Sequence, residues 1–174
     1  MSILKELIET IRTIPDFPEI GIIFRDITTV LQNPVTLTLA VDAIADKLSG
    51  LEFDLIIGPE SRGFIFGVPV AYKLRKGFIP VRKKGKLPYI TVQKSYSLEY
   101  GEAVIEMHKD AIAEGQRVAV IDDLLATGGT CRALTELVEE IGGVVVSMVF
   151  LIELEALKGR ELLKGYNVQS IIQY

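Results

Sequence analysis

The sequence predicts an α/β protein, a single domain with a central, mostly parallel β-sheet flanked by helices. Short apolar segments rich in β-branched residues alternate with segments in which apolar residues recur at helical spacing. No internal repeat and no interdomain linker interrupts this alternation. The length of 174 residues and the 49% of hydrophobic residues suit one domain with a sizeable core.

The expected elements follow one another along the chain. Helices are expected near residues 3–11, 34–50, the later part of 59–77, and 130–143, and strands at 53–58, 78–83, 102–109, 117–121, 144–152 and 168–174. Pro15 and Pro18 end the first helix, and Pro34 and Gly50 bound the second. Pro69 should kink or delay the third helix. Together these elements give the βαβ units of a parallel sheet.

Two stretches lack a regular helical or strand pattern. Residues 17–28 form an irregular apolar segment, and residues 84–100 have no clean period. A loop as long as 84–100 inside a compact domain is usually functional or mobile. In the strand that follows it, Glu106 and His108 share the face expected to be exposed to water, and His108 is given no role.

Composition narrows the class of protein. The net charge of −4 argues against general binding to nucleic acid or to an anionic membrane. No apolar run reaches the ~18–20 residues of a membrane span, and the N-terminal segment does not resemble a secretory signal. The single cysteine, Cys131, fits a reducing compartment and is interpreted as a packed small residue. We therefore expect a cytoplasmic protein.

Three polar segments follow predicted strands. They are "GPESRG" at 58–63, "RKKGK" at 82–86 and "DDLLATGGT" at 122–130. In open α/β sheets, ligands bind at the carboxyl ends of the strands, near a switch point in strand order. We therefore expect all three segments at one edge of the sheet, where they would surround a ligand.

The third segment has the composition of a phosphate-binding loop. Gly128 and Gly129 allow backbone N–H groups to converge on an anion, and Thr127 and Thr130 add hydroxyl donors. The helix that follows directs the positive end of its dipole at the same place. No lysine of a Walker motif is present, so the loop suits a terminal monophosphate.

Asp122 and Asp123 directly precede this loop, at the expected end of a strand. Carboxylates there could accept hydrogen bonds from vicinal sugar hydroxyls or help to hold Mg²⁺. The alternative is that one acid caps the loop and the other is solvated. A sugar with a 5′-phosphate and two ring hydroxyls would satisfy both halves of the motif.

The segment "VAVIDDLLATGGT" at 118–130 resembles the phosphoribosyl-pyrophosphate motif of the type I phosphoribosyltransferases. Further stretches resemble the adenine branch of that family: "FPEIGIIFRDIT", "GPESRGFIFG", "RKKGKLP", "SYSLEYG" and "LKGRELL". The resemblance runs from about Ile14 to Tyr174. It implies the type I phosphoribosyltransferase fold, with an N-terminal hood at about 1–34, a core at about 35–174 and a flexible catalytic loop at about 84–100. It also implies a homodimer.

The implied reaction converts adenine and 5-phosphoribosyl 1-pyrophosphate to AMP and pyrophosphate, a step of purine salvage. The implied cofactor is Mg²⁺, held by Asp122 and Asp123 through water or substrate. Two alternatives stay open. One is transfer to another purine, such as hypoxanthine or xanthine. The other is a non-catalytic sensor of phosphoribosyl pyrophosphate that regulates transcription, although the short helix before Pro15 offers no DNA-binding element.

The resemblance assigns roles to individual residues. Asp122, Asp123, Ala126, Thr127, Gly128, Gly129 and Thr130 would bind the 5′-phosphate and ribose; Glu60, Ser61, Arg62, Arg82 and Lys86 the pyrophosphate; Ile23, Phe24, Arg25 and Leu154 the adenine. Glu99 and Arg62 would be catalytic, and Tyr100 would belong to a lid. The loop after residue 58 often contains a non-proline cis peptide in the family. Arg82 and Lys86 would act on the pyrophosphate of their own subunit or across a subunit boundary, and the sequence leaves this open.

For several of these residues the sequence by itself favours or allows a simpler interpretation. Residues 59–63 could form an ordinary turn, and the basic cluster at 82–86 a solvated loop or a nucleic-acid patch. Residues 23–25 could be a core-packing connection, and a lone loop glutamate such as Glu99 is usually solvent-facing. Tyr89 also departs from the glycine that many relatives carry after "KLP", which would alter the flexibility of the lid.

Overall fold

The computed structural model describes residues 3–98 and 101–174, and the chain forms two compact units, Met1–Ala43 and Ile44–Tyr174. The first unit contains α1 (Ile3–Thr10), β1 (Arg12–Pro15), β2 (Ile23–Asp26), α2 (Thr28–Gln32) and the beginning of α3 (Pro34–Lys47). The second contains β3 (Leu55–Pro59), α4 (Arg62–Leu74), β4 (Gly77–Lys83), β5 (Thr91–Leu98), β6 (Gly101–His108), β7 (Arg117–Leu125), α5 (Gly129–Glu140), β8 (Val144–Glu153), the 3₁₀ turns η1 (Glu155–Leu157) and η2 (Gly159–Leu163), and β9 (Val168–Gln173).

The first unit differs from the expected pattern in its β-hairpin. The first helix ends at Thr10 rather than near Pro15, and part of the segment interpreted as irregular forms β2. β1 and β2 pair antiparallel, with Thr13 opposite Arg25, whose guanidinium donates to the Thr13 hydroxyl at 2.7 Å. Hydrogen bonds between paired strands satisfy backbone N–H and C=O groups, and the spacing of apolar residues within one segment does not reveal such pairing. Strand pairing therefore outweighs the helical spacing that extends to Ile11.

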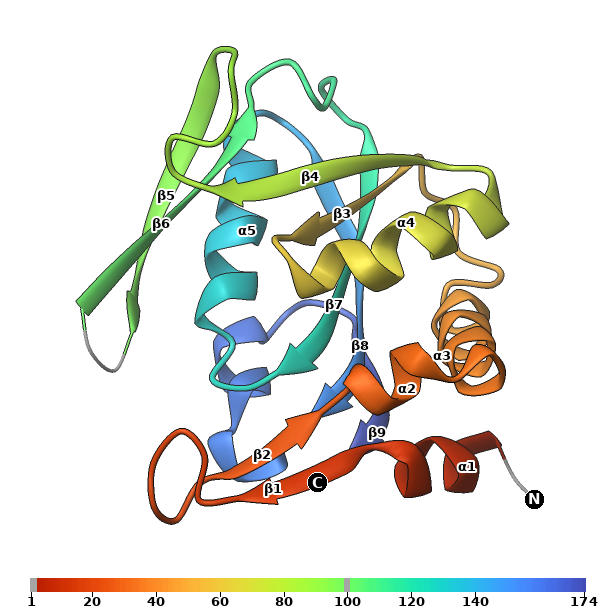
Figure 1. Cartoon of the computed structure of the whole chain (residues 1–174). Helices are drawn as coiled ribbons and strands as arrows, with labels where there is room; N and C mark the ends of the chain where they lie inside the picture. The colour runs from red at the N-terminus through yellow and green to blue at the C-terminus, as the bar shows by residue number, and fades with distance from the viewer. Residues whose placement is uncertain (1–2, 99–100) are drawn as a thin grey trace. The chain divides into compact units, whose positions relative to one another are not determined.

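The second unit is built on a seven-stranded sheet with the strand order β5-β6-β4-β3-β7-β8-β9 (Figure 1). β4, β3, β7, β8 and β9 run parallel to their neighbours, and the hairpin of β5 and β6 joins β4 antiparallel. This arrangement confirms the predicted α/β class with a mostly parallel sheet.

Both faces of this sheet are buried. Ile57, Val120 and Phe150 pack with α5 in one apolar cluster. Because side chains alternate along a strand, the buried neighbours Ile56 and Ile121 point to the opposite face. α4 packs against β3, β4 and β7, and its close approach requires a glycine at one position: a Cβ on Gly67 would lie 2.5 Å from the ring of Phe78.

The stretch 84–100, interpreted as aperiodic, contains β5 over residues 91–98. β5 pairs with β6 along its whole length, and the hairpin extends beside α5 (Figure 1). The pattern was hidden because the half-buried positions include Lys94 and Tyr96 rather than aliphatic residues. Glu106 of β6, expected on the wet face, is only 2% exposed.

In the described part of the chain, none of the helices has the length and apolar character needed to cross a membrane.

Candidate functional site

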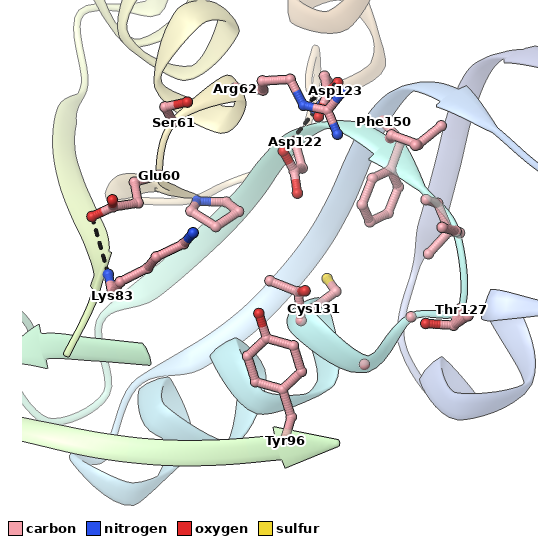
Figure 2. Close-up of a pocket in the computed structure, with 17 residues that line it drawn as sticks. Glu60, Ser61, Arg62, Lys83, Tyr96, Asp122, Asp123, Thr127, Cys131 and Phe150 are labelled. Carbon is pink, nitrogen blue, oxygen red and sulfur yellow. Dashed lines mark hydrogen bonds and ion pairs between the residues drawn. The ribbon is translucent and has the colours of Figure 1, made fainter. Parts of the chain in front are cut away.

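The candidate site is a cavity at the carboxyl ends of β3, β4 and β7. β4 pairs with one edge of β3 and β7 pairs with the other edge, so the strand order changes direction at β3. Such a switch in strand order is where ligands bind in open α/β sheets. The cavity has a volume of about 420 Å³ and is lined by residues 59–62 and 122–131 and by Lys83, Tyr96 and Phe150 (Figure 2).

Residues 126–130 comprise the connection after β7 and the first residues of α5; they form one end of the cavity and are called here the phosphate loop. Gly128 has a φ of 85°, a left-handed conformation that favours glycine. A Cβ at this position would also lie 2.6 Å from the carbonyl oxygen of Gly159. α5 begins at Gly129, so the free N–H groups of its first turn and its dipole favour an anion here.

The 3₁₀ turn η2 supports the phosphate loop from outside the cavity. A side chain at Gly159 would collide with the carbonyl oxygen of Ala126. The next residue, Arg160, donates to Glu153 Oε2 and to the Val168 carbonyl, both at 2.7 Å. Hydrogen bonds from Arg160 hold the pKa of the buried Glu153 carboxyl below its usual value. The motif at 157–163 therefore fixes the backbone on which the loop rests.

Asp122 and Asp123 lie inside β7, not at its end as expected, because the ladder to β8 continues past them as far as Leu125. The Asp123 N–H donates to Asp122 Oδ1 at 2.8 Å, and Arg62 Nε lies 3.1 Å from Asp123 Oδ2. Burial, together with the charge of Asp123, raises the pKa of Asp122 well above its usual range. Burial also raises the pKa of Asp123, although Arg62 opposes this shift. Burial therefore disfavours the ionised form of the pair, and a cation or hydroxyl donors bound in the cavity would offset that cost.

The opposite end of the cavity, called here the basic end, is organised by Glu60. Its carboxylate accepts from Arg82 Nε at 2.9 Å and from the Lys83 N–H at 3.0 Å, and Lys86 Nζ lies 3.5 Å away (Figure 2 shows the Lys83 contact). Burial alone would raise the pKa of Glu60, but the hydrogen bonds and the two cations hold it below its usual value. The peptide bond between Glu60 and Ser61 is cis, as the resemblance implied for this loop.

The structure brings most of the predicted site residues of the second unit together. Those that line the cavity are Glu60, Ser61, Arg62, Asp122, Asp123, Ala126, Thr127, Gly128, Gly129 and Thr130. Arg82 and Lys86 contact Glu60 but are not part of the lining, and Leu154 follows β8 outside it. Ile23, Phe24 and Arg25 belong to β2 in the first unit. Glu99 and Tyr100 lie outside the described residues.

Seven lining residues carried no predicted binding or catalytic role: Pro59, Lys83, Tyr96, Leu124, Leu125, Cys131 and Phe150. Tyr96 of β5 approaches the phosphate loop, since a Cβ on Gly129 would lie 3.5 Å from its ring. This tyrosine belongs to "SYSLEYG", which lies in the stretch that the sequence predicts as a loop. Cys131 is buried, which agrees with its interpretation as a packed residue, and burial raises the pKa of its thiol.

The donors available to a metal at this site are few. Among residues 3–98 and 101–174, no group of three or more His, Cys, Asp or Glu side chains could hold a metal ion. Asp122 and Asp123 supply oxygen donors of the kind that Mg²⁺ prefers. They fit a magnesium ion whose other ligands come from water and substrate oxygens.

Comparisons with known proteins agree with this geometry. Residues 26–173 match the family model described as the phosphoribosyl transferase domain, so the chain belongs to the phosphoribosyltransferase family. Its relatives in this family include adenine phosphoribosyltransferases. That of Lachnoclostridium phytofermentans is 63% identical over 171 residues, which cover 98% of both chains.

Solved structures give the same result. The crystal structure of adenine phosphoribosyltransferase from Thermoanaerobacter pseudethanolicus is 53% identical, with a TM-score of 0.96 over 98% of this chain and 99% of the other. The Saccharomyces cerevisiae enzyme, complexed with adenine and an imino-altritol bisphosphate, is 38% identical, with a TM-score of 0.92 over 97% and 98% of the two chains. The sequence-based assignment to this family is confirmed.

Proposed function

We propose that the protein is a purine phosphoribosyltransferase that converts adenine and 5-phosphoribosyl 1-pyrophosphate to AMP and pyrophosphate. The observation that carries the proposal is the distribution of charge along one cavity. A backbone anion site forms one end, a carboxylate pair lies in β7, and a cluster of cations surrounds the other end. A ribose with a phosphate at C5 and a pyrophosphate at C1 has the complementary order of groups.

The phosphate loop would bind the 5′-phosphate through the N–H groups of residues 126–130 and the hydroxyls of Thr127 and Thr130. Asp122 and Asp123 would accept hydrogen bonds from the two ribose hydroxyls. Asp123 is buried and Asp122 is half-buried, so these hydrogen bonds would be weakly screened by water, and they would offset the desolvation that raises the pKa of both carboxyls.

Arg62, Arg82 and Lys86 would neutralise the pyrophosphate as it leaves, and Ser61 would donate a hydrogen bond to it. Glu60 would act through the cations: its carboxylate holds Arg82 and Lys86 at the edge of the cavity rather than touching the substrate. Preorganised charge that meets the developing charge of a leaving group is a large part of many enzymatic rate enhancements.

The chemical step joins adenine N9 to the anomeric carbon while the bond from that carbon to the pyrophosphate oxygen breaks. The N9 proton must leave, and Glu99 is the proposed acceptor. Ile23, Phe24, Arg25 and Leu154 are proposed to contact the base, and Tyr100 to close over it as part of a lid. Closure would exclude water from the oxocarbenium-like transition state.

Mg²⁺ is the proposed cofactor, supported by the two adjacent acids that line the cavity and by the diphosphate chemistry of the substrate. When bound, it would supply positive charge to the pyrophosphate and ribose oxygens. Asp122 and Asp123 are the residues proposed to hold it, through water or substrate.

A homodimer is the proposed assembly, with Arg82 acting near the subunit boundary. Val68 and Tyr72 on α4 have side chains that are 49% and 87% exposed, which gives this helix an apolar surface that a second copy could cover. The buried single thiol fits the reducing conditions of the cytoplasm, where we propose that the enzyme acts.

The test is a product-balance assay with adenine, phosphoribosyl pyrophosphate and Mg²⁺. We expect AMP and pyrophosphate in equal amounts, with turnover lost when Mg²⁺ is chelated. Tight binding of phosphoribosyl pyrophosphate without turnover for any purine base would contradict the proposal and favour a sensor.

A further inference from the structure

Glu106 is a buried carboxylate outside the cavity. It lies on β6, directly opposite Arg82 of β4, and its side chain is 2% exposed. Its Oε1 accepts from the N–H groups of Lys86 and Leu87, at 2.8 and 2.9 Å. Both N–H groups belong to the loop that follows β4. Glu106 of β6 therefore holds in place the loop that leaves the neighbouring strand.

The other oxygen of Glu106 is also bound. Oε2 accepts from the side-chain amide of Gln93 at 3.2 Å and from the Thr91 hydroxyl at 3.5 Å. A buried charge is costly unless hydrogen bonds replace its water. Burial alone would raise the pKa of Glu106, but the N–H groups of the loop and the Thr91 hydroxyl hold it below its usual value. The carboxyl is therefore ionised at neutral pH, with donors on both oxygens.

The loop that Glu106 holds carries a residue of the basic end. Lys86 follows the turn at Gly85, where φ is 84°, and its Nζ lies 3.5 Å from Glu60. The Lys86 carbonyl also accepts from Arg82 Nη1 at 3.5 Å. Two acids therefore hold Lys86: Glu106 accepts a hydrogen bond from its backbone N–H group, and Glu60 forms an ion pair with its ammonium group.

We propose that Glu106 is a positioning residue for the transfer reaction, which fixes the backbone of Lys86 so that its ammonium group stands ready for the pyrophosphate. The inference rests on the proposed function, and it adds to it a residue that touches no substrate. Lys86 has a long side chain that is 51% exposed, so a mobile backbone would spread its charge over many positions.

The experiment is a double-mutant cycle of Glu106→Gln and Lys86→Ala, with Glu102→Gln as the matched control. Glutamine keeps the size of Glu106 but carries no charge. Its side-chain amide would place an N–H donor against the N–H and O–H groups that now donate to the carboxylate. Glu102 is an exposed glutamate of the same strand. The measured quantities are KM for phosphoribosyl pyrophosphate, kcat, and hydrogen exchange at the amides of Lys86 and Leu87.

We expect Glu106→Gln to raise KM about tenfold with kcat changed by less than about threefold, and to have no further effect on KM when Lys86 is already alanine. Exchange at the two amides should accelerate, and Glu102→Gln should change none of these values. Equal effects of Glu106→Gln with and without Lys86, or unchanged amide exchange, would overturn the inference and leave the proposed function standing. If Lys86→Ala left KM unchanged, the assignment of Lys86 to the pyrophosphate would fail, and the inference with it.

Discussion

The two ends of the cavity are built in different ways. At the phosphate loop, the proposed binding groups are backbone N–H groups, and their positions follow from close contact between Gly128 and Gly159. At the basic end, the proposed binding groups are long cationic side chains. Arg82 and Lys86 are 35% and 51% exposed, and the carboxylate of Glu60 holds them in place.

The difference teaches where each end is vulnerable. A backbone site loses its geometry when a side chain is added nearby, because a packed backbone has no room to move. A side-chain site tolerates such changes but depends on the acids that orient it and on ionic strength. We therefore expect glycine substitutions to damage the first end and carboxylate substitutions the second.

The largest effect is expected for Gly128→Ala. The new Cβ would meet the Gly159 carbonyl oxygen at 2.6 Å and would also have to adopt a left-handed φ. Displacing a substrate-positioning backbone by about 1 Å costs on the order of 100-fold in rate, so kcat/KM for phosphoribosyl pyrophosphate should fall by at least that factor.

Gly165→Ala separates the two causes of this loss. Gly165 also has a positive φ, of 97°, but a Cβ there meets nothing within 4 Å. We expect a lower melting temperature for both variants and near-normal kcat/KM only for Gly165→Ala. Comparable activity of the two variants would refute the backbone account of the phosphate loop.

The next largest effect is expected for Asp122→Asn and Asp123→Asn, between the two ends. Each removes a charged acceptor, and we expect kcat/KM to fall about 10- to 100-fold, which corresponds to roughly 1.5–3 kcal/mol. Calorimetric titration with phosphoribosyl pyrophosphate and Mg²⁺ should show weaker binding. Unchanged affinity in both variants would show that the ribose does not bind at Asp122 and Asp123.

The same pair predicts an unusual pH dependence of stability. Its folded-state pKa values are raised, so over the window above the ordinary aspartate pKa the folded chain binds more protons than the unfolded one. The pair should therefore lower the free energy of unfolding as pH rises through that window. Asp122→Asn should weaken this dependence and raise the melting temperature at neutral pH, as measured by thermal unfolding across pH.

Glu99→Gln is expected to lower the rate of the chemical step, and it tests the lid rather than either end. General acid–base catalysis contributes about 10²–10⁴ in rate. We expect a single-turnover rate at least about tenfold lower, with dissociation constants of both substrates within a few-fold of those of the original protein. Parallel changes in binding and rate would make Glu99 a lid contact only, and an unchanged rate would remove it from catalysis.

The smallest effect is expected from salt, and it compares the two ends directly. The exposed cations of the basic end are screened at high ionic strength, whereas the N–H groups of the phosphate loop are screened less. Raising NaCl from about 0.05 to about 0.5 M should weaken binding of pyrophosphate several-fold and that of ribose 5-phosphate by less. Equal weakening, measured by calorimetry, would remove the distinction between the ends.

The sequence predicted the phosphate-loop end better than the basic end. Most of the groups at the phosphate-loop end belong to one contiguous segment, residues 122–130, so the composition and spacing of that segment indicate their chemistry. The bounds of β7 were wrong because the ladder to β8 holds Asp122 and Asp123 within the strand. The support from Gly159 was not predicted, because a contact between residues about 30 positions apart leaves no local pattern.

The basic end depends on pairing that a local pattern does not reveal. Alternation along β6 placed Glu106 on a wet face, but β5 and the loop after β4 cover it. β5 itself was missed because Lys94 and Tyr96 occupy its half-buried positions. A strand of polar and aromatic residues is specified by its partner rather than by its own hydrophobic pattern.

The measurement that tests the central claim most directly is a base-competition assay with phosphoribosyl pyrophosphate and Mg²⁺. It compares kcat/KM for adenine with the values for hypoxanthine and guanine. A site that recognises the exocyclic amine by hydrogen bonds should prefer adenine by about 10⁴ or more. Comparable values for adenine and hypoxanthine would contradict the adenine assignment, even though the chain would remain a phosphoribosyltransferase.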